Sequence, residues 1–379
     1  MAKEVTRSLD KKIARELWAR AAGRCEFNSC NRPLYKSPIT QEQGNISEIA
    51  HIWSFSEKGP RGWGTSSKEN LNKLSNLMLL CHDCHKTIDL DKKGERYSAK
   101  MLRQWKDEHE KRVAIVTGIN PSKKSHVLLY GANIGDEKSS LQTEHAKEAL
   151  FPHWYPAEEH ALCLSMNWEG KDDRPDYWKT EERNLRESFV RYVIPFIKDA
   201  NPCHFSIFAF APMPLLVLLG SLMTDKIGAQ VYQLHREPMT WHWLRRARKL
   251  KFKVKAPKTC KFPPVLNISL SGAINNERIN AVLGERVSIW RLSIDEPHND
   301  FLKSKEQLVT YREVMRRLIG EINKRHQKHA FLSIFPAMPV ACSVELGRIR
   351  MPKADLPWVI YDQNSKKNSF IKTLKIGGR

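Results

Sequence analysis

The pattern of apolar and polar positions divides the chain into two parts. In the first part, KKIARELWARAAG and YSAKMLRQWKDEHEKRVAIV have apolar residues at helical spacing and predict two amphipathic helices, the first ending at Gly23. From about residue 155, strand-like apolar runs alternate with helical ones, which is typical of an α/β domain. We therefore expect an N-terminal domain over residues 1–118, a linker over 119–154 and an α/β domain over 155–379.

The α/β part contains a weak internal repeat. HFSIFAFAPMPLLVLLG (204–220) and HAFLSIFPAMPVACSVELG (329–347) both run from an apolar strand into a Pro-containing turn, and in both a Pro precedes a Gly by eight residues. ALCLSMNWEG (161–170) and VLNISLSGAIN (265–275) form a second pair, because both are apolar runs with small or polar ends. These likenesses predict a duplication into two α/β halves with a cleft between them. Chance similarity of parallel-sheet segments is the alternative.

The uncharged run Phe205–Met223 approaches the length that spans a membrane. Pro212 and Pro214 interrupt it, so a buried strand, a turn and a short buried helix explain it better. The opening MAKEVTRSLDKK lacks the apolar region of a signal peptide. We therefore expect neither a membrane partner nor export from the cytoplasm.

The composition favours a polyanionic partner. The chain carries 63 Lys and Arg against 42 Asp and Glu, a formal net charge of +21. Such a charge favours nucleic acid but says nothing about fold. The densest run, LRRARKLKFKVKAPKTCK (244–261), predicts an edge strand with one charged face. Either that face is solvated and blocks edge pairing, which we favour, or it meets phosphate.

Four of the eight cysteines have metal-ligand spacing. Two tight pairs lie about fifty residues apart, and each supplies one turn of a tetrahedral Zn²⁺ site. Such a zinc is structural, because all four positions are filled. The pairs are Cys25 with Cys30 and Cys81 with Cys84. The other four cysteines are scattered singly, as buried free thiols in a reducing cytoplasm are.

A catalytic motif surrounds these cysteines. His51 in EIAHIW, Asn76 and His85 in NLMLLCHDCHKTID occur in the order that resembles the HNH endonuclease family over about residues 20–90. The resemblance implies an α+β domain of the ββα-metal fold and metal-dependent hydrolysis of DNA. His51 is then the general base, since a neutral imidazole accepts a proton near pH 7. His85 is a ligand of one Mg²⁺ or Mn²⁺, and Asn76 orients His51 or fixes its loop.

One position departs from the family pattern. Many HNH sites have a second metal ligand directly before the base histidine, and here that position is Ala50. Glu48 shares a strand face with Ala50, so we expect it to reach the ion instead. Asp83 and Asp89 are weaker candidates.

The C-terminal part resembles the SAVED domain, a fusion of two CARF-like, Rossmann-like halves that senses cyclic oligonucleotides. FAFAPMPLLVLLG with VYQLHR and FPAMPVACSVELGR with VIYDQN carry this resemblance. An HNH domain before a SAVED domain resembles the effector nucleases of CBASS anti-phage systems. The resemblance implies activation by a cyclic di- or trinucleotide, of which we favour the dinucleotide.

Ligands of open α/β sheets bind beyond the carboxyl ends of the strands. A cyclic nucleotide needs aromatic faces for its bases and cations or N–H groups for its phosphates. We expect Trp168 to stack on a base and four basic residues, Lys171, Arg174, His235 and Arg236, to meet phosphate. The remaining candidates lie on the turns after the strands: Pro212, Met213, Ser271, Asn275 and Pro339.

These inferences predict a double-stranded DNA endonuclease that a cyclic nucleotide activates by driving homodimers or higher assemblies. Two alternatives stay open. One is a constitutive restriction-type HNH nuclease whose C-terminal domain reads DNA. The other is a binding protein whose HNH unit is only a zinc-stabilised docking module, against which the intact His51, Asn76 and His85 speak.

Overall fold

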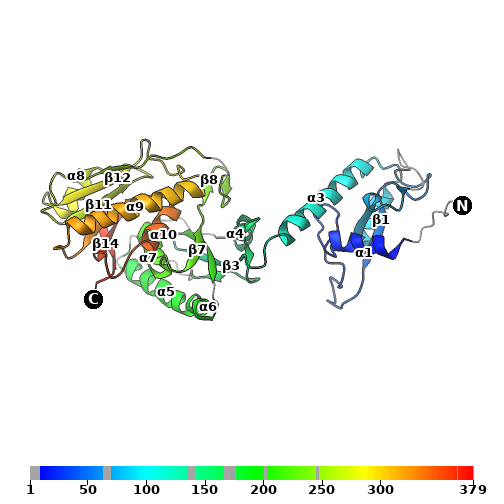
Figure 1. Ribbon diagram of the computed structural model, residues 1–379, viewed down its shortest axis with the longest axis horizontal. Coiled ribbons are helices and arrows are strands. Elements are labelled where there is room, and N and C mark those ends of the chain that lie inside the picture. The colour runs from blue at the N-terminus through cyan, green and yellow to red at the C-terminus, as the bar shows by residue number, and fades with distance from the viewer. Residues whose placement is uncertain are drawn as a thin grey trace. The chain divides into compact units, whose positions relative to one another are not determined.

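The chain forms two compact units, Met1–Pro121 and Ser122–Arg379, and each is described by itself (Figure 1). The computed structural model describes residues 9–62, 70–134, 141–165, 172, 174, 176–199, 203–244, 247–364 and 366–378.

The first unit is built on a two-stranded antiparallel sheet in which Ala50 of β1 lies opposite Met78 of β2. All five residues of β2 are buried. Both predicted helices are confirmed, and Gly23, just beyond the first, has φ +61°, a conformation that favours glycine after a helix. The elements are α1 (Lys11–Arg20), β1 (Ser47–His51), the 3₁₀ helix η2 (Leu74–Asn76), β2 (Leu77–Cys81), α2 (His82–Leu90) and α3 (Ala99–Thr117).

The second unit contains two sheets. The first is parallel, in the order β4-β3-β6-β7, with β5 also paired to β3. Its strands and the helices between them are β3 (Lys124–Gly131), α4 (Thr143–Leu150), β4 (Tyr155–Pro156), β5 (Leu162–Cys163), α5 (Tyr177–Tyr192), α6 (Ile194–Asp199), β6 (His204–Phe210), α7 (Met213–Met223) and β7 (Gly228–Val231).

The second sheet has the order β10-β12-β11-β13-β14-β15, with parallel pairing from β12 to β14 and antiparallel strands at both edges. A short hairpin, β8–β9, precedes it. The elements are β8 (His235–Arg236), β9 (Met239–Thr240), β10 (Lys253–Lys255), β11 (Pro264–Ser269), α8 (Asn276–Leu283), β12 (Ser288–Ser293), α9 (Lys305–Arg325), β13 (Leu332–Ala337), α10 (Val340–Arg348), β14 (Trp358–Asn364) and β15 (Ser369–Ile376).

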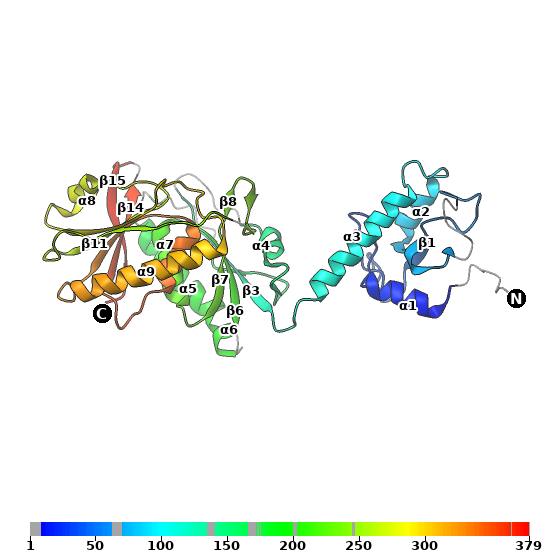
Figure 2. The same cartoon turned by 45° about the horizontal axis from the view of Figure 1, so that its top comes forward.

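Helices α7 and α10 join the two sheets, and each packs on the strands of the other half. α7 follows β6 but contacts β13, β14 and β15, whereas α10 follows β13 but contacts β6 and β7 (Figures 1 and 2). The helices cross at the two repeated glycines. A Cβ on Gly220 would lie 1.9 Å from the carbonyl oxygen of Val344, and one on Gly347 would lie 2.0 Å from that of Val217. The Pro-to-Gly repeat therefore marks a close, reciprocal helix crossing.

Two organisational predictions are wrong. Most of the predicted linker 119–154 belongs to the second unit, because β3 is a buried strand paired to β6 and α4 follows it. The second wrong prediction is the pairing of segment 161–170 with 265–275. The strand of the first half that corresponds to β11 is β3. β11 lies parallel to β13 as β3 lies parallel to β6, whereas 161–170 contributes only the two residues of β5 before residues outside the described set.

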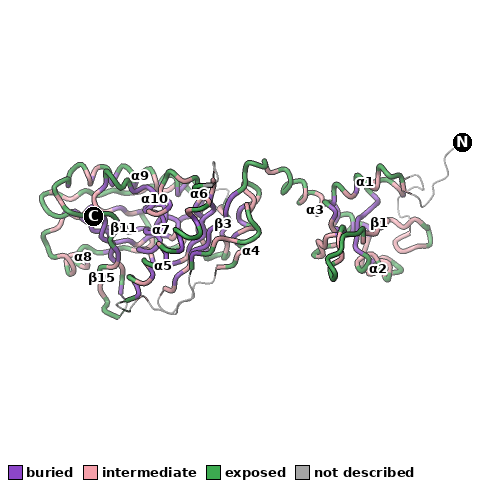
Figure 3. The backbone as a smooth tube through the Cα atoms, turned by 90° about the horizontal axis from the view of Figure 1, so that it is seen from below, coloured by how far each residue is buried: buried purple, intermediate pink, exposed green. Residues whose placement is uncertain are grey.

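Two other segments agree with their predictions. The run 205–223 folds as buried strand β6 and helix α7, and among the described helices none is long and apolar enough to cross a membrane. β10, within the basic run, is an exposed edge strand. Figure 3 shows the buried backbone concentrated in the strands of the sheets and in α7 and α10.

Candidate functional site: two metal positions around a histidine

Four cysteine sulfurs of the first unit form a cluster that can hold a metal ion. The Sγ atoms of Cys25, Cys30, Cys81 and Cys84 all lie within 4.8 Å of one another, and those of Cys30 and Cys81 are 4.0 Å apart. A tetrahedral zinc with Zn–S bonds of about 2.3 Å places its sulfurs about 3.8 Å apart, so the donors fit Zn²⁺. Burial raises the pKa of the Cys25 thiol to about 12, so a bound cation is needed to keep that sulfur ionised.

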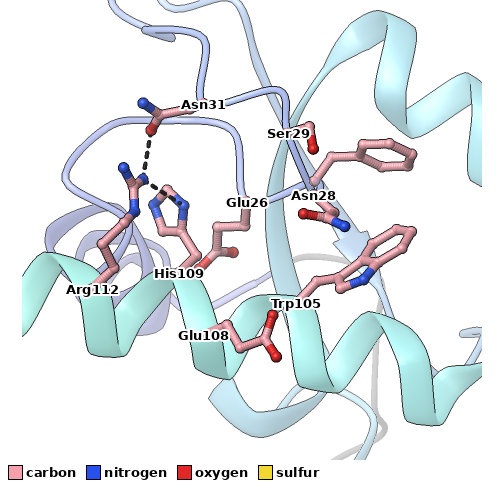
Figure 4. A pocket seen from close by; sticks show the side chains of 9 residues that line it. Glu26, Asn28, Ser29, Asn31, Trp105, Glu108, His109 and Arg112 are labelled. Carbon is pink, nitrogen blue, oxygen red and sulfur yellow. Dashed lines mark hydrogen bonds between the residues drawn. The ribbon is translucent and has the colours of Figure 1, made fainter. Parts of the chain in front are cut away.

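The loop between Cys25 and Cys30 is held from two sides. On one side, Glu26 extends the sheet, because its carboxylate accepts a hydrogen bond from Leu79 N at 2.6 Å and its own N–H donates to Leu79 O at 2.9 Å. On the other side, Arg112 of α3 donates to Asn31 Oδ1 at 2.7 Å. A pocket of about 330 Å³ lies between the loop and α3 (Figure 4). The sulfur cluster is therefore tied to both β2 and α3.

His51 lies at the end of β1 and is half-buried. Its Nε2 lies 3.0 Å from Asn72 Oδ1, and its ring meets Phe55 edge-on at 5.5 Å. Since an amide oxygen only accepts, this contact suits the tautomer with the proton on Nε2 and the lone pair on Nδ1. The imidazole is thus oriented with Nδ1 as its basic atom, which is what a general base requires. Asn72 belongs to no recognised sequence motif, so we did not predict a role for it.

Asn76 fixes the loop that follows His51. Its side chain is buried and makes three hydrogen bonds to the backbone: Oδ1 accepts from Trp53 N at 2.7 Å, and Nδ2 donates to Trp53 O at 3.0 Å and Leu71 O at 2.9 Å. Of the two roles expected for Asn76, this geometry matches the fixing of the loop, whereas the orienting contact to His51 comes from Asn72.

Glu48 lies between two histidines of α2. Its Oε1 accepts a hydrogen bond from His82 Nδ1 at 2.6 Å, and its Oε2 lies 3.4 Å from His85 Nδ1. The His82 hydrogen bond lowers the pKa of Glu48. Adjacent ligand atoms of one octahedral ion, about 2.1 Å from the metal, lie roughly 3 Å apart. The Glu48 and His85 atoms therefore fit neighbouring positions of one Mg²⁺ or Mn²⁺.

Asp89 is another carboxylate near His85. Its Oδ2 lies 3.8 Å from His85 Nδ1, one helical turn away on α2. Asp83 instead pairs with Arg32 at 2.8 Å on the exposed surface. Of the two weaker candidates, Asp89 is thus the one beside His85, and Asp83 is engaged elsewhere. Among the described residues, only the four cysteines bring three or more donor atoms within 4.8 Å of one another, so Glu48, His85 and Asp89 do not form a closed set of ligands here.

A buried arginine that no sequence motif singled out connects these parts. Arg61 donates to Ile52 O at 2.7 Å and to Ile88 O at 3.0 Å, and its Nη2 lies 3.8 Å from Asp89 Oδ1. Its side chain is 3% exposed, and burial lowers its pKa. Arg61 therefore links the residue after His51 to the last turn of α2, where Asp89 lies one turn after His85.

The residues predicted to bind a nucleotide lie in the second unit. Several come together at the carboxyl ends of β6, β11 and β13. Met338 N donates to Met213 Sδ at 3.4 Å, and Ser271 N donates to Ala337 O at 2.8 Å. Pro212, Pro339 and Asn275 occupy the N-cap positions of α7, α10 and α8, without a side-chain capping hydrogen bond. Trp168 and Lys171 lie outside the described residues, and Arg174 and Arg236 are exposed.

His235 is placed against its predicted role. It is 2% exposed and packs edge-on against Trp243, with Asp300 at 3.8 Å. Burial lowers its pKa, so a neutral, enclosed ring replaces the phosphate-facing cation that we expected. The prediction for His235 is therefore wrong for this conformation.

Two further polar residues near the carboxyl ends of the parallel strands were not predicted from the sequence. Gln233, which follows β7 and is buried, accepts from Ala341 N of α10 at 3.2 Å. Desolvation, with a smaller contribution from Asp172, raises the pKa of Asp362 in β14 to about 7. Since Asp172 belongs to the segment between β5 and α5, that segment of the first half reaches the second half.

Comparisons with known proteins divide the chain in the same way. Residues 185–376, 192 of the 379 residues, match the family model described as "SMODS-associated and fused to various effectors sensor domain" (SAVED). Residues 25–90 match the model of an HNH endonuclease. No curated protein matches the chain significantly.

Among solved structures, the chain is similar to Cap4 SAVED/CARF-domain containing receptors. One from Acinetobacter baumannii, with the cyclic trinucleotide 2′3′3′-cAAA, is 12% identical with a TM-score of 0.45, and the match covers 78% of this chain and 66% of that one. One from Moraxella osloensis is 12% identical with a TM-score of 0.42, covering 77% and 65%. The chain thus spans slightly less than two thirds of these receptors.

Proposed function

Because the chain belongs to the SAVED family and carries an HNH endonuclease domain in its first unit, we propose that it is a ligand-switched endonuclease of double-stranded DNA. The observation that carries the catalytic part is the convergence of Glu48 and His85, 3.4 Å apart, in the same small unit as the oriented base His51. Hydrolysis of a phosphodiester needs both a base for water and a cation for the charged phosphate.

In this proposal His51 takes the proton of the attacking water on Nδ1. Asn72 holds the ring through Nε2, and Asn76 holds the backbone just beyond it. The Mg²⁺ or Mn²⁺ supplies stabilisation of the developing negative charge. Glu48 and His85 would hold this ion, and Asp89 lies beside His85 and Arg61. These elements form the ββα-metal arrangement, and Zn²⁺ on the four cysteines keeps β2 and the Cys25–Cys30 loop in place.

The second unit acts as the sensor in the proposal. A cyclic di- or trinucleotide binds at the carboxyl ends of the parallel strands, between the two halves that α7 and α10 join. The sensor description of the SAVED family supports this assignment. Binding favours a homo-oligomer whose HNH units cleave DNA, as a cytoplasmic defence against phage. If the protein is almost inactive without the ligand, the ligand must bind the active state more tightly than the inactive state by several kcal/mol.

Plasmid cleavage tests this proposal. The full chain is incubated with supercoiled plasmid and Mg²⁺, alone and with cyclic di-AMP, cyclic GMP–AMP or cyclic triadenylate. We expect cleavage only with one of these ligands, and a loss of about 10²- to 10⁴-fold in His51→Ala, because a general base contributes that much. His145→Ala is the control, since His145 is an exposed histidine on α4 of the second unit.

Two results would contradict the proposal in different ways. Cleavage at full rate without any cyclic nucleotide would remove the switch and favour a constitutive nuclease. Cleavage that His51→Ala leaves unchanged would remove the catalytic assignment.

A further inference from the structure

A groove runs along α3 in the first unit. It has a volume of about 630 Å³, and Trp53 and residues of α3 line it, among them Lys100, Arg103 and Lys111. These three residues lie three and eight positions apart, so they share one face of the helix. The opposite face of α3 is buried through Leu102 and other residues. The groove thus follows the exposed, cationic side of a helix that is anchored in the core.

The three cations of this groove are available for an external anion. All three are exposed, and within the described residues none of them forms an ion pair. The other basic residues of α3 are engaged differently: Lys106 is buried with Glu110, and Arg112 holds Asn31.

Two carboxylates also line the groove, but they leave it with an excess of one positive charge. Glu108 accepts a hydrogen bond from Gln104 at 2.8 Å, and Asp107 lies one turn from both Arg103 and Lys111. Because it also contains carboxylates, this surface attracts anions less strongly and less generally than a purely basic patch would. It suits an anion whose charges are spaced, with one group near Lys100 and Arg103 and another near Lys111.

The helix end adds a second, independent attraction for anions. α3 begins at Ala99, and Ser98 caps it by accepting from Met101 N at 3.3 Å. The first turn of a helix carries N–H groups without helical acceptors and the positive end of the helix dipole. Because Ser98, Ala99 and Lys100 line the groove, this end faces the same space.

Trp53 supplies an aromatic wall close to the catalytic residues. It lies two positions after His51, and Asn76 bonds both its N–H and its carbonyl oxygen. The Trp53 backbone is therefore held in place with the loop that follows the general base His51. An aromatic ring beside a row of cations is the combination that binds a nucleic-acid strand, with stacking on the ring and phosphates on the cations.

We propose that this groove is the substrate channel of the nuclease, in which one DNA strand lies with its phosphates along Lys100, Arg103 and Lys111 and with Trp53 against a base or sugar. The inference rests on the proposed function, because it names where the DNA of that reaction binds.

Equilibrium binding of a fluorescent DNA duplex tests the channel. The full chain with His51→Ala is used as the parent, with and without the three cyclic nucleotides named above. The variant is Lys100→Gln/Arg103→Gln/Lys111→Gln. The control is Lys11→Gln/Lys12→Gln/Arg15→Gln on α1, which removes the same charge from exposed positions of the same unit.

The groove variant should bind DNA at least ten-fold more weakly than the control at 150 mM salt. The slope of log K against log salt should fall by about 1 for each phosphate that no longer meets a cation, up to about 3. Trp53→Ala should weaken binding about five-fold or more with the slope unchanged, because stacking releases no counterions. In an active background the groove variant should raise KM and leave kcat in place.

Equal binding and equal salt slopes for the groove variant and the control would overturn the channel. That result leaves the nuclease proposal intact as long as the plasmid is still cleaved. Failure of the parent to bind duplex DNA in any condition would instead overturn the nuclease proposal, and the channel with it.

Discussion

The two units of this chain reach stability in different ways. The second unit has one large core that joins both sheets to α5, α7, α9 and α10. The first unit has a smaller core, which includes the two buried cysteines Cys25 and Cys81. The smaller core buries less apolar surface to offset the loss of chain entropy, so we expect zinc on the four cysteines to contribute to the stability of this unit. The comparison predicts that the catalytic unit depends on an ion held by its four cysteines, whereas the sensor unit depends on packing.

The same difference applies to how each unit positions its functional groups. In the first unit, His51, Asn72 and Arg61 lie on or beside irregular loops that a few side-chain hydrogen bonds hold. In the second unit, the candidate ligand site lies where several parallel strands end, so the sheets themselves place it. Substitutions should therefore act on one unit at a time, and the following predictions test this from the largest effect to the smallest.

The largest effect is expected from Cys81→Ser. Loss of one of four zinc ligands should remove the zinc and unfold the first unit, because structural zinc contributes about 10 kcal/mol or more to small metal-dependent domains. The melting transition of the second unit should stay in place. Calorimetry and measured zinc content check this, with the exposed Cys163→Ser as control. Full zinc content with both transitions unchanged would contradict the account of the first unit.

Gly220→Ala is expected to lower the free energy of unfolding of the second unit by a smaller amount. The new Cβ would meet the carbonyl oxygen of Val344 at 1.9 Å, so α7 and α10 must separate. Overpacking of this kind costs about 1–3 kcal/mol. Chemical denaturation should show the loss in the second unit alone, while zinc content stays the same.

Gly320→Ala is the matched control for this substitution. Gly320 lies within α9 with no atom within 4 Å of the new Cβ, so the change should be neutral or stabilising by about 0.5–1 kcal/mol. If Gly220→Ala matched Gly320→Ala in stability, the close helix crossing would not be a structural constraint.

The smallest effect is expected from Glu48→Gln. Loss of one charged ligand should weaken Mn²⁺ binding about ten-fold, or about 1.4 kcal/mol, while both melting transitions stay unchanged. Mn²⁺ titration followed by electron paramagnetic resonance measures this without requiring cleavage. Asp83→Asn is the control, since Asp83 pairs with Arg32 away from the site. Equal Mn²⁺ affinity in the two variants would exclude Glu48 as a ligand.

Much of the first unit could be predicted from its sequence because the relevant signals are local. The spacing of the cysteines anticipated a cluster that the fold brings together, and strand alternation placed Glu48 where it meets His85. Asn72 and Arg61 could not be found in this way. Each acts through contacts that an irregular loop creates across the unit, and such loops carry no periodic pattern.

In the second unit the repeat around Gly220 and Gly347 anticipated the reciprocal helix crossing, because both glycines are required by the same close approach. The first strand, β3, was missed. Its apolar run HVLLY is short and lies between polar segments, so it looked like part of a linker. Its burial comes from pairing with β6, about eighty residues further along the chain, which only the fold reveals.

The central claim is that a cyclic nucleotide bound by the second unit controls the chemistry at His51. The most direct test compares two curves for the activating cyclic nucleotide: its binding to the His51→Ala protein and its stimulation of plasmid cleavage by the unmodified chain. The account predicts that half-maximal cleavage follows half-maximal binding and that cleavage without the nucleotide is at least 100-fold slower, as a preference of about 3 kcal/mol gives. Cleavage that is independent of the nucleotide while binding still occurs would contradict it.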